Sequence, residues 1–306
     1  MKPMLRAVLS QMCRHVWRTV FAILGGAALL SGTAVALETT RIEARGLTVI
    51  ARYADTLEDM DRAPAPQVEV RAGDRRLFQA RFPDEMGRPA LFVTEMDPAN
   101  SRPEVVVEFY SGGAHCCESI DVLEEIPGRP GHWQTVNLGW HDGGERPPKD
   151  LDGDGLTEIV TTDESFLYAY GSYAESYAPP VIMGVRQGRQ VDLTRRPSMR
   201  SFLRREEKRI RRFMRDQWRG RGRPVPAGIL AGYVALKILL GEGPEGWRFM
   251  LANLDPATPP TAACPLDESS VECPVPLLQL DFPAALALHL RTMDYVGRPA
   301  AEGKDR

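Results

Sequence analysis

Short runs of apolar and β-branched residues alternate with turn residues through the first two thirds of the chain. Such runs predict strands, because Val, Ile, Thr and aromatic residues suit the pleated, half-buried surface of a sheet. The predicted strands are residues 47–53, 67–71, 77–82, 90–96, 104–110, 120–125, 133–138, 158–162 and 181–185. Their regular spacing predicts antiparallel β structure, either a β-sandwich or a propeller-like fragment.

From Met199 onward the apolar residues recur at helical spacing. Residues 199–218 predict a basic amphipathic helix, and the Ala-Gly pairs at 227–228 and 231–232 allow another helix to approach closely. Further helices are predicted at residues 227–240, 247–254 and 283–293. The predicted class is therefore α+β. It comprises a β-rich domain over residues 37–195, a helical subdomain over residues 196–296 and a disordered tail over residues 297–306.

The N-terminal residues have the pattern of an export signal. Residues 1–20 carry basic side chains and no acidic ones, residues 21–35 are apolar and small, and Ala34-Val-Ala36 fits the small-x-small cleavage rule. We expect a signal peptide over residues 1–36, cleaved after Ala36, and a periplasmic or secreted protein. The alternative is a short uncleaved membrane anchor.

Charge narrows the range of partners. The chain has 38 basic and 41 acidic residues and a net charge of −3, so its overall balance does not favour nucleic acid. The excess of Arg over Lys is typical of bacterial genomes rich in G and C. The basic helix at 199–218 either contacts an anionic membrane surface or an acidic partner, or docks on the β domain with its cationic face in solvent.

One acidic loop carries the clearest chemistry. Asp150, Asp152 and Asp154 alternate along the chain, Gly155 allows a sharp turn, and Glu158 begins a predicted strand. Oxygen ligands at this spacing suit Ca²⁺. An EF-hand is excluded, because its twelfth loop position is Thr here and two prolines stand before the loop where a helix would enter.

This Asp-x-Asp-x-Asp-Gly-x-x-acid layout resembles the calcium-binding FG-GAP and VCBS-type repeats of β-propellers. The resemblance is close over about 15 residues and departs from the pattern at its ninth position, where Glu replaces Asp. It implies that the calcium ligands are Asp150, Asp152, Asp154, the carbonyl of Leu156 and Glu158. The alternative interpretation is an acidic surface turn that binds no ion.

A degenerate internal repeat accompanies the loop. Shifting the chain by 54 residues places Asn100 on Asp154 and Glu104 on Glu158, whereas the upstream copy lacks the first two aspartates. Two such units are too few to close a propeller, which typically has about four to eight blades.

The cysteines after the signal predict disulfides in an oxidising compartment. Cys264 and Cys273 are expected to close a polar loop, and Cys116 and Cys117 to form a vicinal bridge. Alternatively, His115 with Cys116 and Cys117 forms a soft-metal or redox site, or Cys116 acts as a nucleophile. The string from Gly112 to Cys117 is similar to that of uncharacterised exported bacterial proteins.

Four tyrosines follow the acidic loop. Tyr168, Tyr170, Tyr173 and Tyr177 either form a ligand surface for a protein or glycan partner or pack within the β domain. His289, in an apolar predicted helix, is expected to serve packing.

The sequence contains no Gly-x-Ser-x-Gly elbow, His-Glu-x-x-His motif or phosphate-binding glycine loop. We therefore favour an exported, calcium-stabilised binding or structural protein that is not an enzyme, and leave enzymatic activity open. The first alternative is a calcium-dependent hydrolase that uses residues near His141 and Glu145. The second is a soft-metal or redox protein that uses His115, Cys116 and Cys117.

Overall fold

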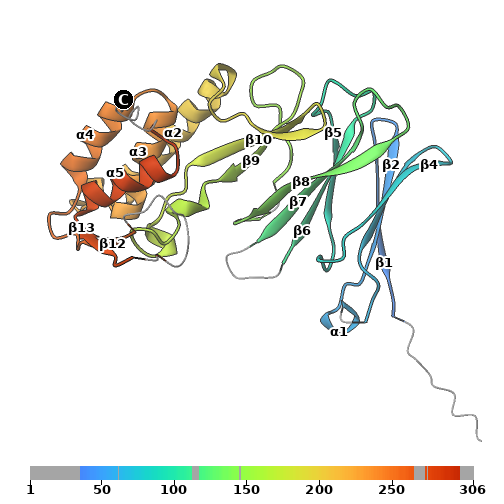
Figure 1. The fold of residues 1–306 in the computed structure, drawn as a ribbon, viewed down its shortest axis with the longest axis horizontal. Helices are drawn as coiled ribbons and strands as arrows, with labels where there is room; N and C mark the ends of the chain where they lie inside the picture. The colour runs from blue at the N-terminus through green and yellow to red at the C-terminus, as the bar shows by residue number, and fades with distance from the viewer. Residues whose placement is uncertain are drawn as a thin grey trace, which may run out of the picture. The chain divides into compact units, whose positions relative to one another are not determined.

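The computed structural model describes residues 35–60, 62–111, 117–144, 146–264, 273 and 275–296. The protein is α+β, as the sequence predicts: antiparallel strands fill its N-terminal part and helices dominate its C-terminal part (Figure 1). The predicted signal peptide, apart from its last two residues, and the predicted tail lie outside the described residues. None of the helices in the described ranges is long and apolar enough to cross a membrane.

Two four-stranded antiparallel sheets follow one another along the chain, each with its strands in sequence order (Figure 1). The first contains β1 (Glu38–Ala44), β2 (Leu47–Tyr53), β3 (Gln67–Ala72) and β4 (Arg75–Arg81), with the short α1 (Leu57–Met60) between β2 and β3. The second contains β5 (Ala90–Thr94), β6 (Glu104–Tyr110), β7 (Glu118–Glu125) and β8 (Trp133–His141).

A third antiparallel sheet has the order β11-β10-β9. Its strands are β9 (Ile159–Thr162), β10 (Pro180–Arg186) and β11 (Arg189–Asp192), and the 3₁₀ turns η1 (Glu164–Phe166) and η2 (Tyr173–Glu175) lie between β9 and β10. Far along the chain, β12 (Thr261–Ala263) pairs with β13 (Leu278–Leu280).

The helices follow the third sheet. They are η3 (Pro197–Met199), α2 (Arg200–Gln217), η4 (Arg219–Arg221), α3 (Ala227–Leu239), α4 (Gly243–Asn253) and α5 (Phe282–Thr292). α3 is the most apolar of them, and its residues from Gly228 to Lys237 are all buried. This burial fits a helix that is hydrophobic around its whole circumference.

The buried side chains form three clusters that connect neighbouring layers. One joins the β1–β4 sheet to one face of the β5–β8 sheet, for example through Val49 and Val107. A second joins the other face of β5–β8 to the β9–β11 sheet, through Val106 and Met183. The third joins the far face of β9–β11 to the helices, where Ile182 and its neighbours contact α2, α3 and α5. Alternate residues of β10 thus enter different cores, as the two-residue period of a strand requires.

Several features differ from the sequence predictions, among them α1 and the short strands β12 and β13, which were not predicted. β1 was not predicted, because its polar and half-exposed residues lack the apolar alternation of a strand. α4 begins at Gly243 and not at Trp247, because Pro244 sits in the first helical turn, where its missing N–H costs nothing. Gly228 of α3 faces backbone and not another helix: a Cβ there would lie 2.6 Å from the carbonyl oxygen of Glu175.

Candidate metal centre

A pair of backbone hydrogen bonds closes the aspartate loop at its base. The N–H of Lys149 donates to the carbonyl of Glu158 at 2.9 Å, and the N–H of Glu158 donates to the carbonyl of Lys149 at 3.0 Å. Within the loop, Gly153 and Gly155 have φ values of +86° and +89°, where side chains with a Cβ are strained. These two glycines let the backbone fold around its own carboxylates.

Backbone N–H groups hold the aspartates in place. Asp150 accepts the N–H of Gly153 on Oδ1 at 2.6 Å and the N–H of Gly155 on Oδ2 at 3.1 Å. Asp152 accepts the N–H of Asp154 on Oδ1 at 3.3 Å. Such local bonds from Asp to the following backbone stabilise a turn and fix the direction of each carboxylate.

Three carboxylates converge on one point. One oxygen each from Asp150, Asp152 and Glu158 lies within 4.8 Å of the others. Asp154 lies outside this group, and its Oδ1 accepts the N–H of Leu156 at 2.8 Å. The structure thus brings together three of the predicted ligands, in an oxygen-only arrangement that suits Ca²⁺ better than a soft metal.

Glu158 is the buried member of the group, with 1% of its surface exposed. Its Oε2 accepts the N–H of Leu151 at 3.1 Å, and Nη2 of Arg186 lies 3.3 Å from its Oε1. Burial raises the pKa of Glu158, and the nearby carboxylates of Asp152 and Asp154 raise it further, against the opposing effects of Leu151 and Arg186. A cation among these carboxylates would offset their repulsion.

The loop is anchored to elements that the sequence did not reveal. The N–H of Thr157 donates to the carbonyl of Glu95 at 2.7 Å, and the hydroxyls of Thr157 and Thr94 lie 2.7 Å apart at the end of β5. Leu151 is buried in the core shared with the helices. Arg186, on β10, also donates to the carbonyl of Met96. No local spacing signals these contacts, because they join distant segments.

The upstream repeat has a similar buried glutamate. Glu104 is fully buried, and its Oε2 accepts the N–H of Met96 at 2.5 Å. The side-chain amide of Asn100 donates to its Oε1 at 2.6 Å. Burial raises the pKa of Glu104 to about 7. In this copy an amide group contacts the glutamate, whereas the downstream glutamate faces two aspartates.

The candidate hydrolase residues are only partly described, since Glu145 lies outside the described residues. Nε2 of His141 lies 2.9 Å from the carbonyl of Leu138, and its Nδ1 lies 3.8 Å from Oε1 of Glu164. A backbone carbonyl only accepts, so the Nε2 of His141 must carry a proton in this arrangement. The other ring nitrogen, Nδ1, faces the carboxylate of Glu164.

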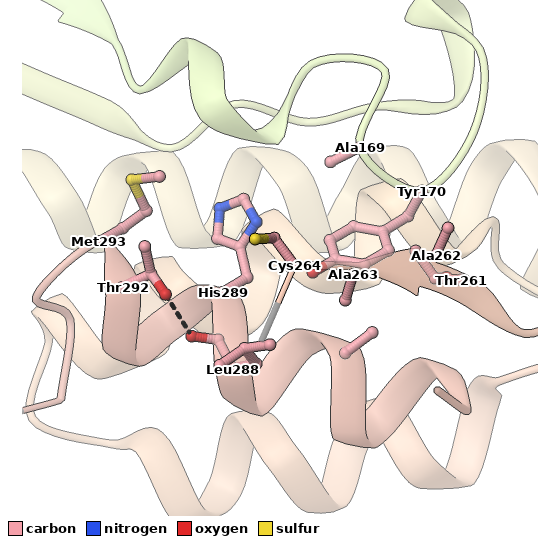
Figure 2. Close-up of a pocket in the computed structure, with 11 residues that line it drawn as sticks. Ala169, Tyr170, Thr261, Ala262, Ala263, Cys264, Leu288, His289, Thr292 and Met293 are labelled. Carbon is pink, nitrogen blue, oxygen red and sulfur yellow. Dashed lines mark hydrogen bonds between the residues drawn. The ribbon is translucent and has the colours of Figure 1, made fainter. Parts of the chain in front are cut away.

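The four tyrosines do not form one surface. Tyr168 is exposed and lies against Tyr173, with ring centroids 5.6 Å apart. Tyr170 packs edge-on against Phe282. Its ring also lies near His289, as Figure 2 shows. Tyr177 packs against the helical core, and its hydroxyl is buried without a hydrogen-bond partner in the described part of the chain. Tyr168 and Tyr173 remain as the accessible pair.

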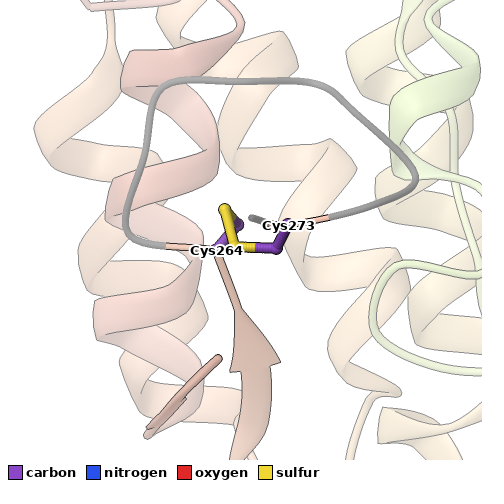
Figure 3. The surroundings of a disulfide bond; sticks show 2 residues. All are labelled: Cys264 and Cys273. Atoms are coloured by element: carbon purple, nitrogen blue, oxygen red, sulfur yellow. A yellow bond between two sulfur atoms is a disulfide. The ribbon is translucent and has the colours of Figure 1, made fainter. Parts of the chain in front are cut away.

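The disulfide between Cys264 and Cys273 forms as predicted, immediately after β12 (Figure 3). Cys117 also belongs to a disulfide. His115 and Cys116 lie outside the described residues, so the vicinal pairing stays a prediction. A disulfide sulfur is a poor metal ligand compared with a thiolate, which weighs against the soft-metal interpretation.

Comparison with known proteins finds a family match for one C-terminal segment. Residues 203–294 match the family described as the sll0997 C-terminal domain. The matched segment runs from α2 through α5, so the aspartate loop lies outside it. No solved structure matches the chain.

Two relatives extend the comparison. The "Probable thylakoid lumen protein sll0997" of Synechocystis sp. is 37% identical over 170 residues, which cover 54% of this chain and 48% of that protein. The "Uncharacterized protein y4bJ" of Sinorhizobium fredii is 29% identical over 250 residues, which cover 78% of this chain and 38% of that protein. The chain therefore spans about half the length of the first relative and less of the second.

Proposed function

We propose that the chain is an exported, non-enzymatic protein whose fold is stabilised by a calcium ion held by Asp150, Asp152 and Glu158. The supporting observation is the convergence of these three carboxylate oxygens within 4.8 Å. One relative is named a probable thylakoid lumen protein, and that name supports export, since a lumenal protein has crossed a membrane. Compartments outside the cytosol contain enough calcium to fill weak sites.

The arrangement of sheets supports the likeness to FG-GAP and VCBS-type repeats. Each of the first two sheets is a four-stranded meander, and the third would also have four strands if the bridged segment at Lys149 counted as its first. On that correspondence, the loop between β5 and β6 and the loop before β9 occupy equivalent places. We propose that the sheets are successive blades of a propeller-like stack that does not close. A β-sandwich formed by the first two sheets is the alternative.

Calcium-dependent melting tests the metal site. Saturating calcium should raise the melting temperature of the mature protein over that in EDTA. At a calcium concentration a hundredfold above Kd the gain is about 2.7 kcal/mol, which corresponds to roughly 5 to 10 °C for a protein of this size. Asp152→Ala should abolish this rise, because it removes one of the three converging carboxylates.

The matched control is Asp255→Ala. Asp255 also accepts a backbone N–H two residues on, from Ala257 at 2.9 Å, but it lies in a different loop. This variant should keep the full calcium response even if it is slightly less stable. A response that persists in Asp152→Ala, or that is absent from the wild type, would contradict the proposed site.

A second proposed contact lies on α2. Several of its cations are paired with acids, including Arg204 with Glu242 and Arg209 with Glu206. Among its other cations, Arg205, Lys208 and Arg212 are exposed and have no ion pair in the described part of the chain. Spacings of three and four residues place them on one face of the helix. We propose that this face contacts an anionic lipid surface.

Vesicle binding tests that contact. The protein should sediment with vesicles that contain phosphatidylglycerol and not with pure phosphatidylcholine. Reversal of Arg205, Lys208 and Arg212 to Glu should weaken binding at least tenfold, since each basic residue near such a surface contributes about 1 kcal/mol. Reversal of Arg75 and Arg81, exposed on β4, provides the control. Equal losses in both variants would indicate a general charge effect and not a docking face.

The accessible pair Tyr168 and Tyr173 is the proposed contact for a protein or glycan partner. The hydroxyl of Tyr173 donates to Oδ2 of Asp142 at 2.6 Å, which holds the pair beside β8. A hydrolase would instead show activity on ester, phosphate or glycoside substrates that disappears in His141→Ala. Such activity would overturn the non-enzymatic proposal while leaving the calcium site intact.

A further inference from the structure

A pocket lies beside α5, away from the aspartate loop. It has a volume of about 260 Å³ and is lined by α5, by β12 with Cys264, and by Ala169 and Tyr170 (Figure 2). A cavity of about 150 Å³ already accommodates benzene, so this pocket has room for a molecule with one ring.

Hydrogen bonds determine the proton position on His289, whose ring rises from α5 into the pocket (Figure 2). The hydroxyl of Ser165 donates to Oδ1 of Asp163 at 2.6 Å, because a carboxylate only accepts. Having used its single proton, the Ser165 oxygen must accept at its second contact, which is Nε2 of His289 at 3.1 Å. Nε2 therefore carries the hydrogen, and Nδ1 keeps its lone pair.

Other contacts hold this chain of hydrogen bonds from Asp163 through Ser165 to His289, here called the relay, in place. The hydroxyl of Tyr295 donates to Oδ2 of Asp163 at 2.9 Å, and the N–H of Ser165 donates to Oδ1 at 3.1 Å. The His289 ring packs on Phe166, with centroids 4.5 Å apart. Burial lowers the pKa of His289, against the opposing charge of Asp163, which favours the neutral ring at pH 7. Nδ1 has no hydrogen-bond partner in the described part of the chain.

Tyr170 provides a second polar group. Its ring reaches toward His289 (Figure 2), with centroids 5.8 Å apart. Burial raises the pKa of its hydroxyl above the usual range, so the group keeps its proton. Like Nδ1 of His289, this hydroxyl has no partner among the residues that the structure describes. Neither atom is among the buried polar atoms without a partner, so both are accessible from the pocket and a ligand can hydrogen-bond to them in place of water.

The rest of the lining is mostly apolar. Thr261 and Thr292 each have a hydroxyl, and that of Thr292 already donates to the carbonyl of Leu288 at 3.2 Å. Cys264 is oxidised in its disulfide and offers no thiol. The apolar lining consists of Ala169, Ala262, Ala263, Ala285, Leu288 and Met293. Among the residues that the structure describes, none in the lining is an acid, a lysine or an arginine, so a charged ligand would lose its hydration there without compensation.

We propose that this pocket binds a small, uncharged molecule with an apolar ring and one hydroxyl group, which donates to Nδ1 of His289 and accepts from the hydroxyl of Tyr170. Both unpaired groups are then satisfied, and the ring fills the apolar part of the pocket. This site shares no residue with the aspartate loop, so it does not depend on the proposed calcium function.

Phenol and toluene form a matched pair of probes, since they have the same ring and differ only in a hydroxyl that replaces a methyl group. Ligand-observed NMR on the wild-type protein should show saturable binding of phenol and weaker binding of toluene. Tyr170→Phe should weaken phenol binding roughly 3- to 10-fold, the usual effect of one hydrogen bond, and leave toluene binding unchanged. Tyr168→Phe makes the same change on an exposed ring and should have no effect. Ala263→Leu should abolish binding of both probes by filling the pocket.

The proton relay has its own readout. Long-range ¹H–¹⁵N spectra should show His289 as the Nε2–H form in the wild type and as a mixture in Ser165→Ala, and phenol should shift the Nδ1 resonance. The proposal is overturned if phenol and toluene bind equally, or if phenol binding survives Ala263→Leu. It is also overturned if the Nδ1 resonance of His289 does not shift when phenol is added. The first and third comparisons require no variant, so a folding defect would not obscure them.

Discussion

Glu104 should make the protein less stable as the pH rises toward 8, and Glu104→Gln should remove that effect. The carboxyl is fully buried, and burial raises its pKa from 4.5 to about 7. The folded state therefore holds a proton between these values that the unfolded state releases. The contribution of Glu104 to stability is largest below about pH 4.5, falls as the pH rises through 7, and is then constant.

The magnitude follows from the same values. A tenfold change in proton affinity is worth about 1.4 kcal/mol, so the rise in pKa from 4.5 to about 7 corresponds to roughly 3 kcal/mol of stability. Of this, roughly 2.5 kcal/mol is lost between pH 5 and pH 8. Gln at this position stays neutral and can be accommodated. Its carbonyl replaces the carboxylate as acceptor for Met96, and a flipped Asn100 accepts its amide through Oδ1, which is buried without a partner in the described part of the chain.

Urea unfolding of wild type and Glu104→Gln from pH 5 to pH 8, in constant calcium, measures the difference. The variant should gain roughly 2.5 kcal/mol relative to the wild type across this range. Glu43→Gln, on an exposed position of β1, should follow the wild type. Parallel stability curves for wild type and Glu104→Gln would refute the account, because they would mean that the carboxyl is not protonated in the folded state near pH 6.

Two further predictions concern packing and the disulfide. Gly232→Ala should destabilise the protein by about 1 to 3 kcal/mol in chemical unfolding, because the added Cβ would overlap the carbonyl oxygen of Tyr177; Gly144→Ala, where the Cβ meets open space, should be near neutral, and equal effects would contradict the reasoning. Joint replacement of Cys264 and Cys273 by Ala should cost about 2 to 3 kcal/mol and speed proteolysis near β12. An unchanged melting temperature and digestion pattern would show that the bridge is dispensable.

Much of the fold follows from local pattern. β6 was predicted to the residue, because Glu104–Tyr110 is dense in Val and aromatic side chains. Prediction from apolar pattern fails where a strand is not buried, because its sequence is then not constrained to apolar residues. β1 has polar side chains at half-exposed positions and is held mainly by backbone pairing with β2, which leaves no periodic signal. Helix starts such as that of α4 depend on whether a proline stands inside the first turn or before it, a choice that composition alone does not resolve.

In the candidate sites, too, residues close together in the sequence could be predicted, whereas contacts between distant segments could not. Spacing alone placed Asp150, Asp152 and Glu158 in one loop, because their convergence is a property of a short segment. Arg186 lies 28 residues from its partner Glu158, and no spacing rule connects them. His289 was expected to serve packing only; its partner Ser165 lies 124 residues away, so the relay could be seen only in three dimensions.

The core between the third sheet and the helices limits how this chain can be divided. Leu151, Phe166, Ile182 and Leu193 contribute buried side chains to the same cluster as the helices. The segment 203–294, which matches the family, contains none of them. A fragment cut at its start would expose the apolar faces of α2 and α3 to water and would tend to aggregate. Any fusion or shortened version of this protein should therefore keep β9 and β10 attached to the helices. A fragment limited to residues 203–294 is too short to bury this core.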